Sequence, residues 1–257
     1  MIAIILFAAL VAAPALAQDG PHLLFHADFD DGLAADVAAG EAEATLLRRD
    51  DGDDEAIEEI ERAPGVVGQG VVTAEDYVRY TGEGNINAEA GTVELWVKPV
   101  DWTGDDDLFH VFFNTNNKNP GWLILYKYLK TEADTGISRS LTFYVGGDPG
   151  GERLRPLMVP QTRVEWRPGT WHHVAGTWEK GRAVLYIDGA MIGEGTGGAV
   201  PTGEFSQLNF GQPWGKPGPR TTVLDEARIY DAPLSAEQIR AGFAATVFNR
   251  TKAKAQS

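Results

Sequence analysis

Apolar and polar residues alternate over short runs along most of this chain, and Gly, Pro, Asp or Asn residues separate the runs. In GTVELWVK (91–98) and GWLILYKY (121–128), β-branched and aromatic side chains recur at short intervals. Such alternation is typical of strands with one buried face. The runs lie at 22–29, 69–80, 91–98, 107–113, 121–128, 139–145, 153–159, 171–178, 183–188, 205–210 and 221–230. Their spacing predicts an all-β sandwich of two antiparallel sheets.

One segment near the C-terminus has the pattern of a helix instead of a strand. Ser235 and Gln238 have the spacing of a capping box, and apolar residues follow on one face. We therefore predict one short helix over residues 235–244. The basic segment 249–257 (NRTKAKAQS) is predicted to be a flexible tail.

Four segments carry more specific patterns. Residues 171–189 contain two strand-like runs, WHHVAGTW and AVLYID, around the polar turn EKGR, which predicts a β-hairpin. The other three are 24–30 (LFHADFD), 91–99 (GTVELWVKP) and 223–239 (VLDEARIYDAPLSAEQI). Together they extend over nearly all of the chain that follows the N-terminal apolar segment.

Taken in their order along the chain, the four segments resemble the laminin-G-like jelly rolls of the concanavalin A-like lectin/glucanase superfamily. The resemblance implies a jelly-roll β-sandwich over residues 18–248 and a location outside the cytoplasm. It does not supply a function, because this fold hosts lectins, glycosidases, lyases and adhesion modules alike.

The N-terminus and the absence of cysteine also indicate export. Residues 1–17 are apolar and end in Ala-Leu-Ala, which predicts a cleaved secretory signal peptide. No Lys or Arg precedes the run, so an uncleaved anchor is the alternative, although the run is shorter than the ~20 residues that span a bilayer. The chain has no Cys, which excludes disulfides and thiolate metal sites and favours a bacterial extracytoplasmic protein.

The net charge of −15 narrows the choice of partner. An acidic surface repels nucleic acid and anionic lipid, so a glycan or another cell-surface polymer is the better expectation. Residues 50–61 (DDGDDEAIEEIE) hold eight acids in twelve positions. We interpret this run as a solvated, loop-like insertion and not as a catalytic carboxylate pair.

No catalytic motif is found in the sequence. The E-x-D-x-x-E run of laminarinase-like members is missing, no Ser lies in a G-x-S-x-G elbow, and no Cys is present. Polysaccharide lyases use a His/Tyr/Arg set on a concave sheet. Here His110, Tyr126 and Tyr144 could face the same way, but their spacing does not require it.

Aromatic and amide residues form the candidate ligand-binding set. Trp214 lies in a Gly/Pro-rich loop with little core to fill, which favours exposure for binding. The amide-rich segment before residue 121 and one face of the run 121–128 supply the rest of the set. Its members are Trp214, Asn114, Asn116, Asn117, Trp122 and Tyr126. For Trp122 and Tyr126, packing in the sandwich core is the alternative that the pattern favours.

The resemblance also implies a structural Ca²⁺ that ties the opening strand to the closing strand. The matching positions are Asp30 and Asp225, with Asp28 and Asp36 as weaker candidates. Carboxylate and carbonyl oxygens are the ligands that Ca²⁺ takes. The alternative is that Asp225 accepts backbone hydrogen bonds where strands cross, and the sequence leaves both open.

These observations lead to three hypotheses of function. The first is an exported, non-catalytic, glycan-recognising binding module that calcium stabilises. The second is a glycan-active hydrolase or lyase whose residues come from different strands. The third is a surface adhesion or structural module with a protein partner.

Overall fold

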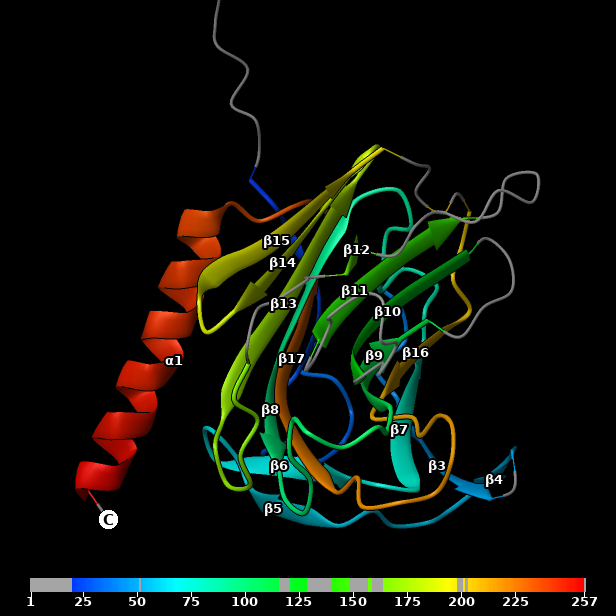
Figure 1. The fold of residues 1–257 in the computed structure, drawn as a ribbon, viewed down its shortest axis with the longest axis vertical. Helices are drawn as coiled ribbons and strands as arrows, with labels where there is room; N and C mark the ends of the chain where they lie inside the picture. Colours follow the sequence, from blue (N-terminus) through cyan, green and yellow to red (C-terminus); the bar gives the residue numbers. More distant parts are fainter. Residues whose placement is uncertain are drawn as a thin grey trace, which may run out of the picture.

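Two antiparallel β-sheets pack face to face, and one helix lies along the outside of the larger sheet (Figure 1). The computed structural model describes residues 20–50, 52–115, 121–128, 140–147, 157–158, 164–197, 201 and 203–256. The predicted signal peptide, residues 1–17, lies outside them. No helix of the described residues is long and apolar enough to span a membrane. The predicted jelly-roll sandwich is confirmed.

The larger sheet has nine strands, with β15, β14, β13, β8, β17, β1 and β2 in that order, while β6 pairs with β17 and β5 with β6. The bounds are β1 Leu23–Ala27, β2 Val37–Ala38, β5 Arg62–Pro64, β6 Gln69–Thr73, β8 Gly91–Pro99, β13 His172–Glu179, β14 Arg182–Ile187, β15 Ala190–Thr196 and β17 Thr222–Tyr230. Strands β8 and β17 lie at its centre and are buried along most of their length.

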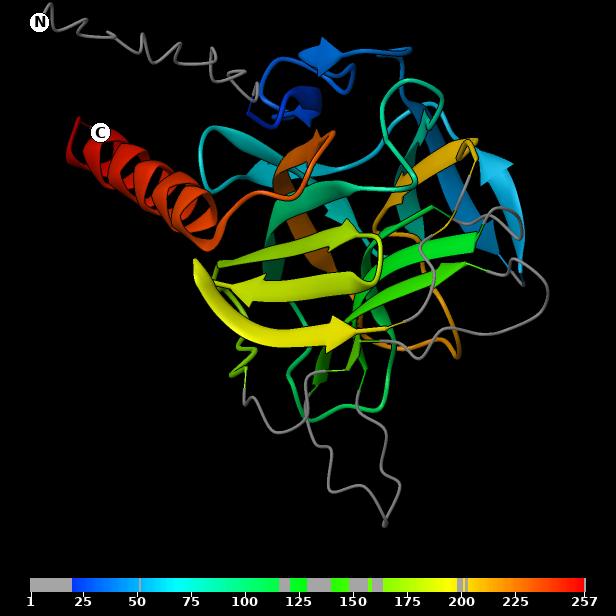
Figure 2. The same ribbon diagram turned by 90° about the horizontal axis from the view of Figure 1, so that it is seen from above.

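The smaller sheet has eight strands in the order β12, β11, β10, β9, β16, β7, β3 and β4. The bounds are β3 Thr45–Asp50, β4 Asp53–Ala56, β7 Asp76–Thr81, β9 His110–Asn114, β10 Gly121–Tyr128, β11 Ser140–Gly147, β12 Leu157–Met158 and β16 Gln207–Phe210. Figure 2 shows the two sheets from above, with the helix on the far side of the nine-stranded sheet from the eight-stranded one.

Alternation along the strands builds the core between the sheets. Val93, Leu95 and Val97 of β8 and Leu123 and Leu125 of β10 are all fully buried in one cluster. Since successive side chains of a strand point to opposite faces, the residues between them on β10 lie on the face turned away from the core. We call this the outer face of the eight-stranded sheet.

The predicted hairpin forms with β13 and β14 as its strands. Their register pairs Trp178 with Ala183 and Glu179 with Arg182, so Lys180 and Gly181 make the turn. Gly181 has a φ of 75°, which glycine adopts without steric cost in tight hairpin turns.

The run 69–80, predicted as one strand, is two. Strand β6 belongs to the nine-stranded sheet and β7 to the eight-stranded sheet, and the chain crosses between the layers at Ala74 and Glu75. Period-two alternation continues on both sides of such a crossing, so the pattern alone cannot locate it. The acidic run 50–61 is not wholly a loop, because β4 pairs with β3 and sets Arg49 opposite Asp54. Opposite charges across two strands favour that pairing.

The C-terminal helix α1, Ala236–Gln256, is longer than predicted. Its capping box is confirmed, since the Ser235 N–H donates to the Gln238 side chain at 2.8 Å and the Gln238 N–H donates to Ser235 Oγ at 3.2 Å. The predicted end at residue 244 and the flexible tail from 249 are wrong, because residues 249–256 are helical. This stretch contains Ala, Lys and Arg and neither Gly nor Pro, so nothing in it ends a helix.

Candidate functional site

A cleft of about 660 Å³ lies beside the outer face of the eight-stranded sheet. Trp122, near the start of β10, and Trp214, in the loop between β16 and β17, both line it. Their ring centroids are 6.0 Å apart and their planes are inclined at 71°. The structure therefore brings together the two tryptophans that the sequence predicted for binding.

Trp122 does not belong to the core. Leu123 and Leu125 of the same strand are fully buried between the sheets, so Trp122 points to the outer face, where it is 37% exposed. The core interpretation that the pattern favoured for Trp122 is thus wrong. Tyr126 lies on the same face of β10 and is half-buried, with its ring centroid 5.7 Å from that of Phe109.

A chain of hydrogen bonds holds the indole of Trp214. Trp214 Nε1 donates to Gln212 Oε1 at 3.0 Å, and Gln212 Nε2 donates to Tyr77 Oη at 3.2 Å. Arg79 donates to the same Tyr77 oxygen at 2.6 Å. Gln212 and Tyr77 are both fully buried, and burial raises the pKa of Tyr77 to about 12, so its hydroxyl keeps its proton. The orientation of the Trp214 indole is therefore set by the buried side chains of Gln212 and Tyr77.

Asn114 belongs to the far end of this network and not to the cleft wall. Arg79 Nε donates to Asn209 Oδ1 at 2.8 Å, and Asn209 Nδ2 donates to Asn114 Oδ1 at 3.1 Å. Asn114 is the last residue of β9 and is fully buried, because β10 and β16 flank it on both sides. Its predicted role as an exposed loop amide is wrong. Asn116 and Asn117 lie outside the described residues.

Charged groups at the cleft are paired with one another. Arg220 Nη1 donates to the Trp214 carbonyl at 3.2 Å, and Arg220 Nε lies 3.6 Å from Glu75 Oε1. On the other side, Arg49 Nε lies 3.8 Å from Asp54 Oδ1. The cleft thus presents aromatic rings together with polar donors and acceptors, and each of its two arginines lies within 4 Å of a carboxylate. That combination is typical of sites for polar ligands with apolar faces.

Four aromatic or charged residues of the cleft were missed in the sequence: Phe109, Arg49, Glu75 and Arg220. Phe109 precedes β9 within the apolar run LFHVFF, where nothing in the pattern separates the surface phenylalanine from the buried Phe112 and Phe113. Glu75 and Arg220 lie in turns that converge only when the sheets pack. No sequence signal that we can identify would have found them.

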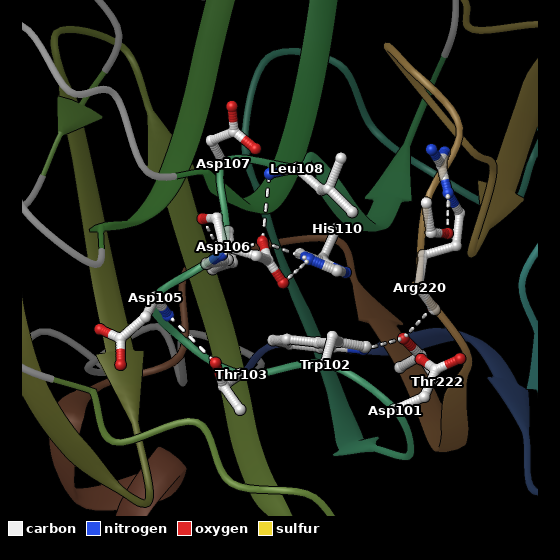
Figure 3. Close-up of polar contacts among 12 residues, drawn as sticks. Asp101, Trp102, Thr103, Asp105, Asp106, Asp107, Leu108, His110, Arg220 and Thr222 are labelled. Atoms are coloured by element: carbon white, nitrogen blue, oxygen red, sulfur yellow. Dashed lines mark hydrogen bonds and ion pairs between the residues drawn. The ribbon is translucent and has the colours of Figure 1, made fainter.

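A second cluster of ionisable groups lies between the two sheets, outside the cleft (Figure 3). Lys127 Nζ donates to Asp106 Oδ1 at 2.6 Å, and His110 Nε2 is 3.0 Å from each carboxylate oxygen of Asp106. The His110 ring stacks on Trp102 with centroids 3.8 Å apart. The triple-aspartate turn at 105–107 therefore supplies a buried ion-pair partner that the sequence did not reveal.

Burial and pairing compete in this cluster. Burial raises the pKa of Asp106, but the bonds from His110 and Lys127 outweigh it and lower that pKa to about 2. Burial lowers the pKa values of both His110 and Lys127. His110 faces the space between the sheets, whereas Tyr126 and Tyr144 lie on the outer face. The His/Tyr set that a lyase would need is therefore not on one face.

Asp30 and Asp225 both hold the turn that joins β5 to β6. Asp225 Oδ2 accepts bonds from the backbone N–H groups of Val66 at 2.6 Å and Val67 at 3.2 Å. Asp30 Oδ1 accepts from the Gln69 N–H at 2.6 Å. The hydrogen-bonding role left open for Asp225 is confirmed, and the two carboxylates accept bonds from the same turn.

Two observations concern a calcium ion at this turn. Burial raises the pKa of Asp225 to about 8, although backbone N–H bonds from Val66, Val67 and Glu226 act in the opposite direction. Among the described residues, however, no group of three or more His, Cys, Asp or Glu side chains could hold a metal ion. Asp28 and Asp36 bond to backbone N–H groups of their own loop at 2.9 and 3.0 Å. The calcium site stays a prediction.

Comparison with known proteins agrees with this architecture. A family model described as the concanavalin A-like lectin/glucanases superfamily matches residues 72–240. A search of the curated proteins gives no match. Among solved structures, domain 4 of AbnA, a GH43 extracellular arabinanase from Geobacillus stearothermophilus in complex with arabinotriose, is 23% identical. Its TM-score is 0.62, and the match covers 87% of this chain and 98% of that one.

Two toxin structures are similar at lower identity. Botulinum neurotoxin type C, described as entering cells through interaction with two ganglioside molecules, is 12% identical with a TM-score of 0.63, and 87% of this chain matches 50% of that one. The binding domain of Paraclostridial Mosquitocidal Protein 1 is 15% identical with a TM-score of 0.56, and 78% of this chain matches 51% of it. The chain thus spans about half the length of these two. At such identities the likeness establishes the fold alone.

Proposed function

Because the chain belongs to the concanavalin A-like lectin/glucanase superfamily, we propose that it is a glycan-binding module and that Trp122 and Trp214 form its binding site. The observation that carries this proposal is the cleft itself. Two tryptophans from distant parts of the chain converge at 6.0 Å on one surface, beside an arginine–glutamate pair. Two similar structures, the arabinanase domain with arabinotriose and the ganglioside-dependent neurotoxin, add support.

The chemistry of the cleft suits a sugar. Sugar rings have C–H faces that pack against aromatic rings, and their hydroxyl groups donate and accept hydrogen bonds. Trp122 and Trp214 offer the aromatic surfaces, while Arg220 and Glu75 offer the polar partners. Because Gln212 already fixes the indole of Trp214, little side-chain entropy is lost when a ligand binds.

A glycan array followed by titration of the best ligand tests the proposal. Trp214→Ala should weaken binding at least about tenfold, which corresponds to about 1.4 kcal/mol, and a melting curve checks that the domain stays folded after Gln212 loses its bond to the indole. Phe248→Ala is the matched control, because this ring is 69% exposed on α1, a helix outside the nine-stranded sheet. Full binding by the Trp214 variant would exclude this cleft as the site.

The proposal is for a non-catalytic module. A retaining glycosidase needs two carboxyl groups about 5–5.5 Å apart, and Glu75 is the one acid among the described residues that line the cleft. A reducing-sugar assay, run beside the array, tests this part. Product release from any polysaccharide would favour the hydrolase or lyase alternative. Binding to a protein partner alone would favour an adhesion module.

We place this function outside the cytoplasm. The apolar segment 1–17, the absence of Cys and the acidic charge of −15 support export and a glycan or cell-surface polymer as partner. Fractionation of a bacterial expression host, with mass measurement of the recovered protein, would show whether the segment is removed during export. Retention of the full-length chain in the cytoplasm would contradict this part of the proposal.

We also propose that Asp30 and Asp225 would hold a stabilising Ca²⁺ at the turn they share. The geometry supports this, because both carboxylates accept backbone N–H bonds from the turn between β5 and β6. When bound, the ion would supply a link between the opening and closing strands. No part of glycan binding is assigned to it, and removal by a chelator tests it.

A further inference from the structure

Aromatic side chains continue from the cleft across the outer face of the eight-stranded sheet. Strand β10 carries Trp122, Tyr126 and Tyr128 on this face, at positions that alternate with its buried leucines. Tyr144 of the neighbouring strand β11 adds a ring whose centroid lies 6.4 Å from that of Trp122. We call Trp214, Trp122, Tyr144, Phe109, Tyr126 and Tyr128 the aromatic row.

Phe109 joins the two halves of the row. It lines the cleft together with Trp122 and Trp214. It also stacks on Tyr128, with ring centroids 3.9 Å apart and planes parallel to within 1°, and lies 5.7 Å from Tyr126. The two groups of rings therefore meet at the cleft, through Phe109.

The length of the row exceeds one sugar ring. Trp122 and Tyr128 are six residues apart on a single strand, and a strand rises about 3.3 Å per residue, so they are separated by about 20 Å. A single sugar ring in the cleft would leave Tyr126 and Tyr128 untouched. These two tyrosines and Phe109 are half-buried, so part of each side chain reaches the surface.

We infer that the aromatic row binds several successive rings of a linear glycan, with the Trp122–Trp214 cleft at one end of the site. This inference rests on the proposed function and deepens it by naming the ligand class: an unbranched, uncharged polysaccharide chain and not a terminal sugar. Charges at the cleft form no cluster of one sign, because Arg220 lies beside Glu75 and Arg49 shares Asp54 with Arg79, and this favours a neutral chain. Because Phe109 and Tyr128 already stack, they are ordered before a ligand arrives.

A length series tests the inference. The probes are oligosaccharides of increasing length, from two to about six rings, cut from whichever linear glycan binds on the array. Isothermal titration with the full chain should show affinity that rises with each ring and then levels off. Tyr128→Ala should weaken binding of the longest probe several-fold and leave the disaccharide unaffected, whereas Trp214→Ala should weaken binding of every probe.

Phe248→Ala, at the exposed ring on α1, is the matched control, and its affinity for the longest probe should stay within about twofold of the wild type. Melting curves of all variants separate loss of contact from loss of fold. Affinity that is the same for two rings as for six would overturn the inference while leaving the glycan-binding proposal intact. An array with no bound glycan would overturn both.

Discussion

The buried pair of Asp106 and Lys127 gives the sharpest test of how this fold is held together. Asp106→Asn removes the carboxylate but keeps a side chain of nearly the same shape. Lys127 Nζ, whose side chain is 0% exposed, would then lack the acid that now lies 2.6 Å away. The ammonium would keep its bond to the Asp106 carbonyl at 2.9 Å. Among the described residues, the variant therefore leaves a buried ammonium with only the more distant charges of Asp105 and Asp107 nearby.

The expected cost follows from the burial of the two partners. Removing one partner of a buried ion pair costs about 3–5 kcal/mol. Asp106 is 21% exposed, so water screens the pair in part and the lower end, about 3 kcal/mol, applies. For a domain of this size each kcal/mol moves the melting midpoint by about 2–4 °C, which gives a drop of roughly 6–12 °C.

Urea unfolding at pH 7, followed by tryptophan fluorescence, measures the free energy of unfolding. The double variant Asp106→Asn/Lys127→Met is the control, since it removes the unpaired charge and should recover most of the loss. A single variant within about 1 kcal/mol of the wild type would refute the reasoning. So would a double variant no more stable than the single one, because the loss would then not come from the charge of Lys127.

Three further predictions concern pH, calcium and packing. The stability that the carboxylate of Asp106 contributes is fully present above its unfolded pKa of about 3.9 and is lost as pH falls through its folded pKa of about 2. Asp106→Asn should therefore lose less stability than the wild type over that acid range. Parallel profiles of unfolding free energy against pH would contradict this. If Asp30 and Asp225 hold Ca²⁺, EDTA should lower the melting temperature, since a ligand at a hundredfold excess over its Kd stabilises the folded state by about 2.7 kcal/mol. An unchanged melting curve would leave Asp225 as a hydrogen-bond acceptor alone. Gly176→Ala should cost about 1–3 kcal/mol in urea unfolding, because the added Cβ would lie 2.7 Å from the ring of Phe143; an unchanged midpoint would mean that the ring moves aside.

The sequence predicted part of the candidate site, namely the exposed Trp214, but gave the wrong surroundings for Trp122 and Asn114. Trp214 was found because a tryptophan among Gly and Pro has no core to enter, and this signal is local. For Trp122 the strand pattern pointed to the core, because alternation defines two faces without saying which of them is covered. Asn114 was misplaced since its burial comes from the strands on either side, β10 and β16, which lie later in the chain.

The sequence by itself determined the class of fold, the hairpin β13–β14 and the cap of α1. Each depends on side-chain alternation or turn chemistry over a few neighbouring residues, and local sterics and hydrogen bonds decide these. Only the tertiary structure decided that the run 69–80 divides between two sheets, that Asp106 reaches Lys127, and that Phe109 joins Trp122 to Tyr128. Local sequence does not predict these contacts, because strand order and the packing of two sheets bring the residues together.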